Sequence, residues 1–169
     1  MNTLIIYISD IHFTGTRQEN EGVVINAFLK DVKKQLGEMP HKDVFLFIGG
    51  DLVQKADDKN SYERFWNDVI MPLLAIGIPK EHIVSVPGNH DVQRKKIEDG
   101  KQIYAPLVGQ GFSEATFNDF LDRDIQVPFL TSKFENYKSF LTDKLEVANY
   151  NDIGYPVELN DDWSIYCIN

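Results

Sequence analysis

Three short stretches of the chain combine carboxylate, imidazole and amide side chains at spacings that suit metal chemistry. They are Asp10-Ile11-His12, Gly50-Asp51 and Gly88-Asn89-His90-Asp91. Oxygen ligands from carboxylates and amides, together with imidazole nitrogens, bind divalent metals such as manganese, iron and zinc. The same groups can transfer protons during hydrolysis. The stretches therefore predict a metal-dependent site, provided that the fold brings them together.

The first two stretches carry the weaker signal when each is taken alone. Asp10 and His12 are separated by one residue, so in extended backbone their side chains point the same way and can reach one cation. Gly49 and Gly50 allow a sharp turn that brings Asp51 against a ligand. The alternative interpretations are a turn aspartate beside a surface histidine, and a glycine turn with a capping aspartate before a helix.

The third stretch is more specific because four consecutive residues match a functional pattern. An amide oxygen (Asn89), an imidazole (His90) and a carboxylate (Asp91) offer a metal ligand, a proton donor and an orienting acid on one turn. Four consecutive matching residues arise by chance far less often than a tripeptide with a free middle position. We therefore prefer the functional interpretation to a purely structural turn here.

Each stretch directly follows an apolar run rich in β-branched and aromatic residues, which predicts a buried strand. The runs cover residues 4–8, 44–48 and 83–86. Helical spacing of apolar residues separates them at 18–36 and 61–76, with Pro72 expected to bend or restart the second helix. Alternating strands and helices indicate an α/β fold with a largely parallel sheet, whose strands end at one edge. We expect the three stretches to converge there.

The remainder of the chain is less regular. The expected elements are a helix over residues 113–121 with Ser113 as its N-cap, a helix over 131–145, and a hairpin of 155–159 and 163–168 around turn residues 160–162. A basic cluster follows the third stretch, at Arg94, Lys95, Lys96 and Lys101. This cluster could contact a nucleotide or polyphosphate, although a solvated helix face is the preferred interpretation.

The composition of the 169 residues, with 43% apolar and 25% charged, is that of a single globular domain over residues 1–169. The single cysteine, Cys167, excludes an internal disulfide and favours a reducing, cytoplasmic compartment. No apolar stretch approaches the ~20 residues of a membrane helix, so we expect no membrane partner. A net charge of −9 disfavours nucleic acid as a partner but does not exclude it, because bound metal would neutralise several acids.

In this order and at these spacings, the motifs resemble those of the calcineurin-like metallophosphoesterase family. The motifs are Asp10-x-His12, Gly50-Asp51 and Gly88-Asn89-His90-Asp91, and the resemblance covers about the first ninety residues. It implies a four-layer α/β/β/α sandwich and a site for two divalent metal ions, whether manganese, iron, zinc or magnesium. Asp10 and His12 would bind the first metal. Asp51 would bridge the two metals, and Asn89 would bind the second.

The resemblance also implies a reaction. A hydroxide bridging two metals roughly 3.5–4 Å apart would attack a phosphoric ester, with His90 over the substrate as an acid or phosphate contact. His90 and the bridging Asp51 would then be the catalytic residues. The implied function is that of a phosphomonoesterase or phosphodiesterase acting on a small, nucleotide-like phosphoester. Two alternatives stay open: a nuclease resembling the double-strand-break repair exonucleases, and a non-catalytic signalling or binding module with a decayed site.

The chain departs from the family pattern at two points. Family members usually supply further histidines after the third motif, whereas none follows His90 here, and His41 and His82 are expected to be ordinary surface residues. Because the chain also stops within a predicted strand, we expect the domain to be incomplete at its C-terminus, a longer chain to continue it, and the fragment alone to bind metal weakly. Gln54 stands where many family members have an aspartate that raises the pKa of the histidine, and it brings no charge.

Overall fold

The computed structural model describes residues 3–37, 44–99, 105, 109, 113–121, 132–150, 154–160 and 163–168. The strands in these ranges are β1 (Leu4–Ile8), β2 (Val44–Ile48), β3 (Ile83–Ser85), β4 (Gly154–Asn160) and β5 (Trp163–Ile168). The α-helices are α1 (Glu21–Leu36), α2 (Lys59–Phe65), α3 (Met71–Ala75), α4 (Arg94–Asp99), α6 (Glu114–Leu121) and α8 (Glu135–Ser139). Short 3-10 turns are η3 (Lys80–His82) and η4 (Asn89–Asp91), and π-helical turns are η2 (Trp66–Ile70) and η5 (Phe140–Lys144).

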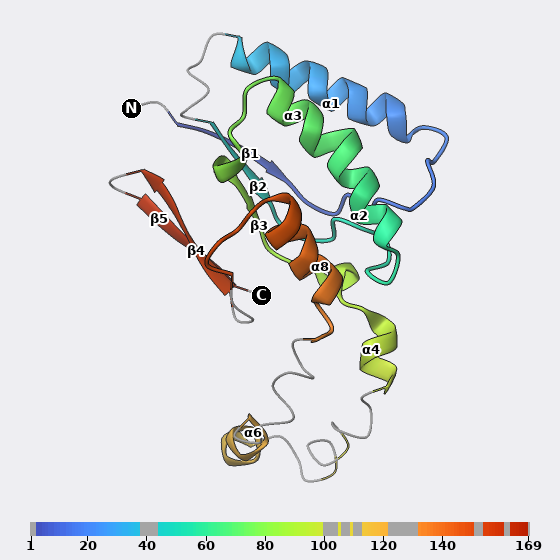
Figure 1. Ribbon diagram of the computed structural model, residues 1–169, viewed down its shortest axis with the longest axis vertical. Helices are drawn as coiled ribbons and strands as arrows, with labels where there is room; N and C mark the ends of the chain where they lie inside the picture. The colour runs from blue at the N-terminus through green and yellow to red at the C-terminus, as the bar shows by residue number, and fades with distance from the viewer. Residues whose placement is uncertain are drawn as a thin grey trace.

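The strands β1, β2 and β3 form a parallel sheet in that order (Figure 1). The central strand β2 is almost wholly buried, as its unbroken apolar sequence predicts for a strand with a neighbour on each side. The strands predicted over 4–8 and 44–48 are confirmed, and the third ends one residue earlier than predicted, at Ser85. The parallel sheet and its crossover helices confirm the α/β class.

The second crossover is one continuous helical rod made of α2, η2 and α3. It begins at Asp58, whose carboxylate accepts hydrogen bonds from the Asn60 amide (3.1 Å) and the Ser61 hydroxyl (3.0 Å). Pro72 lies near its end, and a proline has no N–H to donate to the preceding turn. The rod widens into the π-helical turn η2 just before this point, which is a common way for a helix to absorb such an interruption. The bend or restart predicted at Pro72 thus corresponds to the change from the π-helical turn η2 to α3 within a rod that stays continuous.

The later elements follow their predicted positions closely. Helix α6 begins after Ser113, whose hydroxyl accepts a hydrogen bond from the Thr116 amide (3.2 Å), so the predicted N-cap is confirmed. The helix predicted over 131–145 is present as α8 followed by η5, although α8 begins later than predicted, at Glu135. The strands β4 and β5 pair antiparallel as predicted. Five expected positions lie outside the described residues: His41, Lys101, Thr131 and the turn residues 161 and 162.

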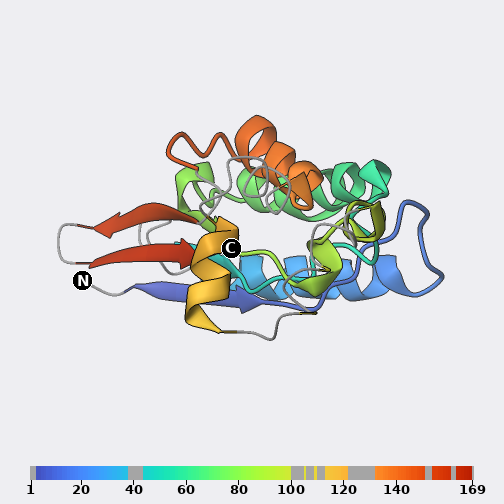
Figure 2. The same ribbon diagram turned by 90° about the horizontal axis from the view of Figure 1, so that it is seen from below.

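A single hydrophobic core joins the sheet, its crossover helices and the α8–η5 segment. Fully buried members from each part include Leu46 of β2, Phe65 of α2, Leu73 of α3 and Leu141 of η5. Figure 2 shows the β4–β5 hairpin beside the parallel sheet, and the two sheets are separate by their hydrogen bonding. The four-layer arrangement implied by the resemblance stays a prediction.

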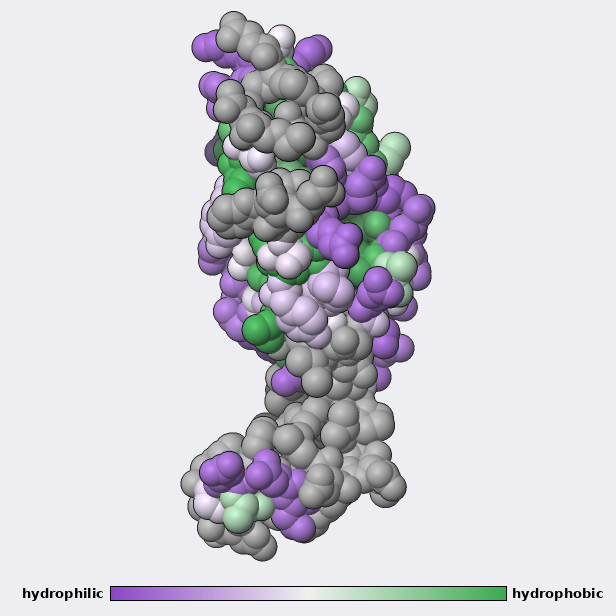
Figure 3. All heavy atoms as spheres, turned by 90° about the vertical axis from the view of Figure 1, so that its left-hand side faces the viewer, coloured by the Kyte–Doolittle hydropathy of each residue, from purple (hydrophilic) through white to green (hydrophobic). Residues whose placement is uncertain are grey.

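Some large hydrophobic side chains remain exposed on strands that lie at the edges of the described sheets. They are Ile5 and Tyr7 of β1, and Tyr166 and Ile168 of β5. Figure 3 shows hydrophobic residues reaching the surface between hydrophilic ones on one side of the molecule. In the described part of the chain, no helix has both the length and the apolar character needed to cross a membrane.

Candidate functional site

The loops that follow β1 and β2 stay hydrogen-bonded to each other after the strands end. The amide of His12 donates to the carbonyl of Asp51 (2.9 Å), and the amide of Phe13 donates to the carbonyl of Leu52 (2.9 Å). Phe13 also forms an isolated parallel bridge with Val53. The first two motifs therefore lie side by side, as the parallel topology predicts.

Backbone strain is concentrated in these two loops. Asp10 (φ 56°), His12 (φ 52°) and Asp51 (φ 53°) adopt the left-handed backbone conformation that residues other than glycine rarely occupy. Each such residue costs about 1–3 kcal/mol, and strain of this kind clusters at functional sites. Only one other non-glycine residue in the described ranges, Glu146, shares this conformation. The strain therefore marks the same residues that the motifs singled out.

The third loop docks onto the second through two glycines. Gly50 has a φ of +100°, and a Cβ atom there would lie 2.7 Å from the amide nitrogen of Gly88. A Cβ atom on Gly88 would in turn collide with the carboxylate of Asp51. Both positions require glycine because the two backbones touch. This close approach brings the turn η4 up to Asp51.

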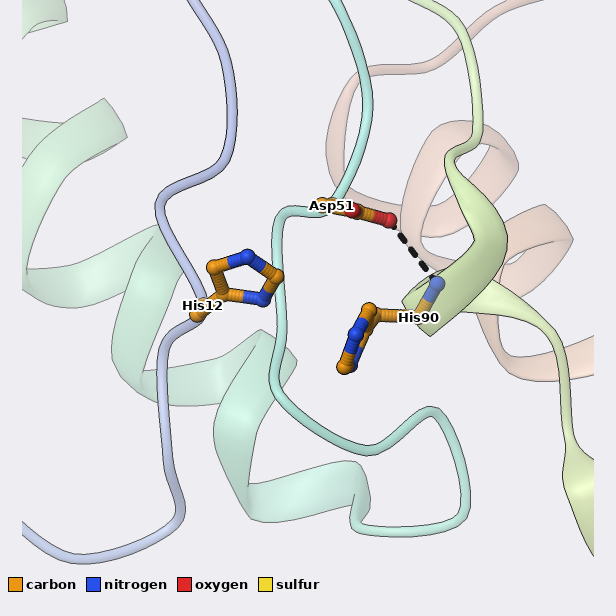
Figure 4. A group of neighbouring side chains, drawn as sticks. All are labelled: His12, Asp51 and His90. Carbon is orange, nitrogen blue, oxygen red and sulfur yellow. Dashed lines mark hydrogen bonds between the residues drawn. The ribbon is translucent and has the colours of Figure 1, made fainter.

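The convergence of the loops produces a compact group of possible metal ligands, drawn in Figure 4. One ligand atom from each of His12, Asp51 and His90 lies within 4.8 Å of the others. The two imidazole rings meet edge to face with their centroids 4.5 Å apart. The amide of His90 donates a 2.8 Å hydrogen bond to Oδ1 of Asp51, which fixes the carboxylate. Two imidazoles and one carboxylate suit a borderline divalent ion such as zinc, manganese or iron.

The hydrogen bonding of the two histidines fits a metal site. Nδ1 of His12 is buried and has no hydrogen-bond partner among the residues that the structure describes. A buried polar atom without a partner is unusual, and an ion would satisfy it. Nδ1 of His90 lies 2.8 Å from the backbone carbonyl of Gln54. Because a carbonyl only accepts, Nδ1 carries the proton, and Nε2 of the neutral ring keeps its lone pair.

The structure brings some predicted site residues together and leaves others at the margin. His12, Asp51 and His90 form the compact group. Asp10 is exposed and is not a member of that group, although it precedes His12 in the same strained loop. Asn89 is exposed at the start of η4. The metal-binding roles of Asp10 and Asn89 therefore stay predictions.

Asp91 is wholly buried behind the site and ties its loops together. Its carboxylate accepts hydrogen bonds from the amides of Leu52 (3.2 Å), in the second loop, and Gly88 (2.9 Å), in its own loop. The hydroxyl of Tyr62 in α2 supplies a third (3.1 Å). Burial raises the pKa of the Asp91 carboxyl, while the three hydrogen bonds act in the opposite direction. Burial and the charge of Asp91 both raise the pKa of Tyr62.

Two of these interactions cannot be predicted from the sequence. Asp91 matches the expected orienting acid, but nothing in the sequence indicates that Tyr62 reaches it from 29 residues away. At Gln54 the sequence draws attention to the side chain, whereas the structure uses the backbone carbonyl to hold His90. Any residue at position 54 provides that carbonyl. The missing aspartate therefore leaves the orientation of His90 intact and removes only a charge.

The remaining candidates lie away from the site or serve packing. His82 is half-buried at the opposite end of β3, where its ring stacks on Phe45 with centroids 4.2 Å apart. Its Nδ1 lies 2.9 Å from the carbonyl of Val44, so His82 has a packing role and is not a plain surface residue. In the basic cluster, Lys96 pairs with Glu135 (3.2 Å). The cluster is therefore partly neutralised.

Comparisons with known proteins agree with this geometry. The family model described as calcineurin-like phosphoesterase matches residues 3–165. A curated relative from Bacillus subtilis (strain 168), named uncharacterized metallophosphoesterase-like protein YydB, is 32% identical over 95 residues, which are 56% of this chain and 18% of that protein. The chain thus matches less than one fifth of the length of this relative. No solved structure matches the chain. With its three motifs converging on one sheet edge, the chain belongs to the calcineurin-like phosphoesterase family.

Proposed function

We propose that this chain hydrolyses small phosphoric esters, as a phosphomonoesterase or phosphodiesterase, at a centre that holds two divalent metal ions. Family membership implies metal-dependent phosphoester hydrolysis, and the finer assignment rests on the residues of this site. The observation that carries it is the convergence of His12, Asp51 and His90 beside a buried imidazole nitrogen that lacks a partner. Asp10 and Asn89 are proposed as further ligands, and the substrate as nucleotide-like.

Each residue of the site has its own role in this proposal. His12 and Asp51 hold the metals, which when bound supply Lewis acidity and an acidified water molecule. The amide of His90 keeps the Asp51 carboxylate in one orientation. The strained loop conformations and the Asp91 hydrogen bonds hold these groups in place before any ligand arrives. Because the ligand groups are already in place, metal binding requires little further ordering of the loops.

His90 is proposed as the proton donor to the departing alcohol. Its Nδ1 proton is held by the carbonyl of Gln54, so Nε2 is the atom that can carry a second proton to the substrate. Among the residues that the structure describes, no carboxylate side chain is hydrogen-bonded to the ring, and Gln54 offers only its backbone carbonyl. A Gln54→Asp change adds an anion near the imidazole and should move the activity profile toward higher pH.

The proposal is tested with Mn²⁺ and two chromogenic esters, 4-nitrophenyl phosphate and bis(4-nitrophenyl) phosphate. We expect hydrolysis of at least one ester, its loss with a chelator, and loss of both Mn²⁺ binding and turnover in Asp51→Asn. Asp143→Asn is the matched control, because Asp143 is exposed in η5, outside the candidate metal group. Hydrolysis that survives chelation, or an Asp51→Asn variant that behaves like Asp143→Asn, would overturn the proposal.

The role of His90 is tested separately with His90→Ala. A general acid contributes about 10²–10⁴-fold, and more for poor leaving groups. We therefore expect Mn²⁺ affinity to be kept, and the loss of rate to be larger for an alkyl phosphate than for a nitrophenyl phosphate. Equal losses on both esters would make His90 a phosphate contact, and a loss of Mn²⁺ affinity would make it a ligand.

A further inference from the structure

A polar cavity of about 380 Å³ lies beside the candidate metal group, between the loops that contain residues 14–18 and 54–61. Gln54 joins the cavity to the site: it lines the cavity, and its carbonyl holds the His90 ring. Thr14 lines the opposite wall and directly follows Phe13, which is hydrogen-bonded to the second motif loop. The cavity therefore opens next to the place where a phosphoryl group would bind. Its size is within the range of small-ligand pockets.

The side chains that line this cavity all end in polar or charged groups. None of the described residues that line it has an aromatic or aliphatic hydrocarbon side chain. The side chains of Thr16, Gln54 and Asn60 make no hydrogen bond to any residue that the structure describes, so their donors and acceptors are available. A ligand with several hydroxyl groups matches such a wall, because each hydroxyl both donates and accepts.

A second cavity, which includes Asp10 of the first motif, has a more apolar lining. It is lined by Asp10 together with apolar side chains such as Ile8, Val24 and Phe28. An aromatic or aliphatic group would gain more from burial against those residues than it would in the polar cavity. The two cavities thus distinguish the two kinds of ester substituent by their chemistry.

The loop that forms the polar cavity is held rigidly by a partly buried ion pair. Arg64 donates to the backbone carbonyl of Thr14 (2.5 Å) and pairs with Glu21 (2.9 Å). Glu21 also accepts a hydrogen bond from the amide of Gln18 (2.9 Å), so one ion pair fixes both ends of the loop. The side-chain amide of Gln18 also donates a hydrogen bond to the Thr14 hydroxyl across the loop (3.1 Å). A wall built in advance binds its ligand with a smaller entropic cost.

The loop also passes so close to α2 that only glycine fits at one position. A Cβ atom on Gly15 would collide with the carboxylate of Asp58, the cap of that helix. This contact fixes the distance between the two walls.

From these observations we propose that the polar cavity is the subsite for the alcohol part of the phosphoester, and that this alcohol is polyhydroxylated, as in a sugar or glycerol. The inference rests on the proposed function, because it assumes that a phosphoryl group binds at His12, Asp51 and His90. It deepens that function by naming the substrate class. The subsite recognises the hydroxyl groups through Thr16, Gln54 and Asn60.

The test is a titration of the full chain with Mg²⁺ and three phosphate monoesters, followed by amide resonances in NMR. The probes are glycerol 3-phosphate, ribose 5-phosphate and phenyl phosphate. We expect at least one hydroxylated ester to shift the amides of Thr16 and Asn60 and to bind more tightly than phenyl phosphate. Tighter binding of the ribose ester identifies a sugar-type alcohol, and tighter binding of the glycerol ester identifies a glycerol-type alcohol.

Near-isosteric variants separate recognition from folding. Thr16→Val and Asn60→Leu each remove hydrogen-bonding groups. Each should lower the affinity for the preferred hydroxylated ester by about 3–10-fold, while the affinity for phenyl phosphate is unchanged. Asn149→Leu is the matched control, since Asn149 is exposed in a different cavity, near the start of β3. The subsite proposal would be overturned if the variants lost affinity equally for all three esters, or if phenyl phosphate bound the unmodified chain as tightly as the other two.

The subsite and the proposed function can fail independently. Hydrolysis of esters without shifts at Thr16 and Asn60 overturns the subsite and leaves the hydrolase proposal standing. Shifts at those amides, with no hydrolysis of any ester in the presence of Mn²⁺, overturn the hydrolase proposal and leave a site that binds hydroxylated esters.

Discussion

Two buried clusters of tyrosine hydroxyls lie near the end of β3, and they differ in the groups to which the tyrosines are hydrogen-bonded. In the Asp91 cluster, the hydroxyl of Tyr62 donates to a carboxylate that also binds two loop amides. In the Ser85 cluster, Tyr137 donates to the hydroxyl of Ser85 (3.0 Å), and Tyr155 donates to its carbonyl (2.6 Å). The first cluster is charged and touches the site. The second is neutral and joins α8 and the hairpin to the sheet.

Because of this difference, the Ser85 cluster should affect stability alone, whereas the Asp91 cluster should affect both stability and the site. Breaking the Ser85 cluster leaves buried polar groups unpaired but does not move the loops that carry His12 and Asp51. Breaking the Asp91 cluster has the same kind of cost and also removes the hydrogen bond that holds the loop of Asp51 to the third loop. We therefore expect both clusters to contribute to folding, and only the Asp91 cluster to contribute to metal binding.

The largest contrast is expected between Asp91→Ala and Ser85→Ala. Asp91→Ala leaves the Tyr62 hydroxyl and two amides unpaired, so the free energy of unfolding should fall by about 3 kcal/mol or more. Its affinity for Mn²⁺ should fall by about 10–100-fold. Ser85→Ala leaves only the Tyr137 hydroxyl unpaired, with a fall of about 1–3 kcal/mol and no change in affinity. Urea unfolding and calorimetric titration measure the two quantities.

If Asp91→Ala does not fold, Asp91→Asn keeps the shape of the side chain and two of its acceptor sites. Its affinity for Mn²⁺ should still lie below that of Ser85→Ala. The same Mn²⁺ affinity in the Asp91 and Ser85 variants would contradict the division between the clusters.

A finer contrast comes from removing one hydroxyl from each cluster. Tyr62→Phe and Tyr137→Phe each delete one buried hydrogen bond, so each should lower the free energy of unfolding by about 1 kcal/mol. Mn²⁺ affinity should fall by about 3–10-fold in Tyr62→Phe, and it should stay constant in Tyr137→Phe. A purely structural role for Tyr62 predicts that the two variants bind Mn²⁺ equally well, and that result would refute a positioning role.

Alkaline pH offers a test of the hairpin side of the Ser85 cluster. Burial raises the pKa of the Cys167 thiol of β5, so the folded state holds its proton more tightly than the unfolded chain does. The stabilising effect is therefore complete below the unfolded pKa of about 8.5 and is lost as the pH rises further. Buried tyrosines add a similar loss from about pH 10, because burial also raises the pKa of Tyr155. Urea unfolding between pH 7 and 10 should show a shallower decline in Cys167→Ala, and parallel curves would contradict the assignment.

The smallest effect is expected from an ion pair that belongs to neither cluster. Lys80 and Glu146 lie 2.7 Å apart near the start of β3, and the Glu146 side chain is 71% exposed. Such pairs contribute about 0.2–1 kcal/mol because water and salt screen them. Lys80→Met should therefore change the free energy of unfolding by less than either tyrosine variant, and 1 M salt should remove the difference. A larger loss would show that the end of the sheet remote from the site is more tightly coupled than the two clusters imply.

Much of the architecture could be predicted because it depends on local pattern. The apolar runs over 4–8 and 44–48 form strands with those limits, and Pro72 interrupts its helix as its missing N–H requires. The parallel topology then brings His12 and Asp51 together, since the strands before them end at one edge. These inferences need only the order of the elements along the chain.

The details of the site could not be predicted because they depend on how elements settle against each other in space. Tyr62 reaches Asp91 only through the placement of α2, and no residue pattern encodes that distance. The bond from His90 to Gln54 uses a backbone carbonyl, which is the same for every residue type. Asp10 is exposed although it shares its left-handed backbone conformation with His12 and Asp51, and no residue pattern indicates that difference.

The hydrogen bonds that carry the ladder past β1 and β2 have a consequence for the order of folding events. Asp51 and His90 are 39 residues apart, and the chain between them must close before they meet. A slip of one residue between neighbouring strands would turn alternate side chains to the wrong face and scatter the group. The unfolded chain therefore offers no preformed nucleus around an ion. The site is completed only when the strands have found their register.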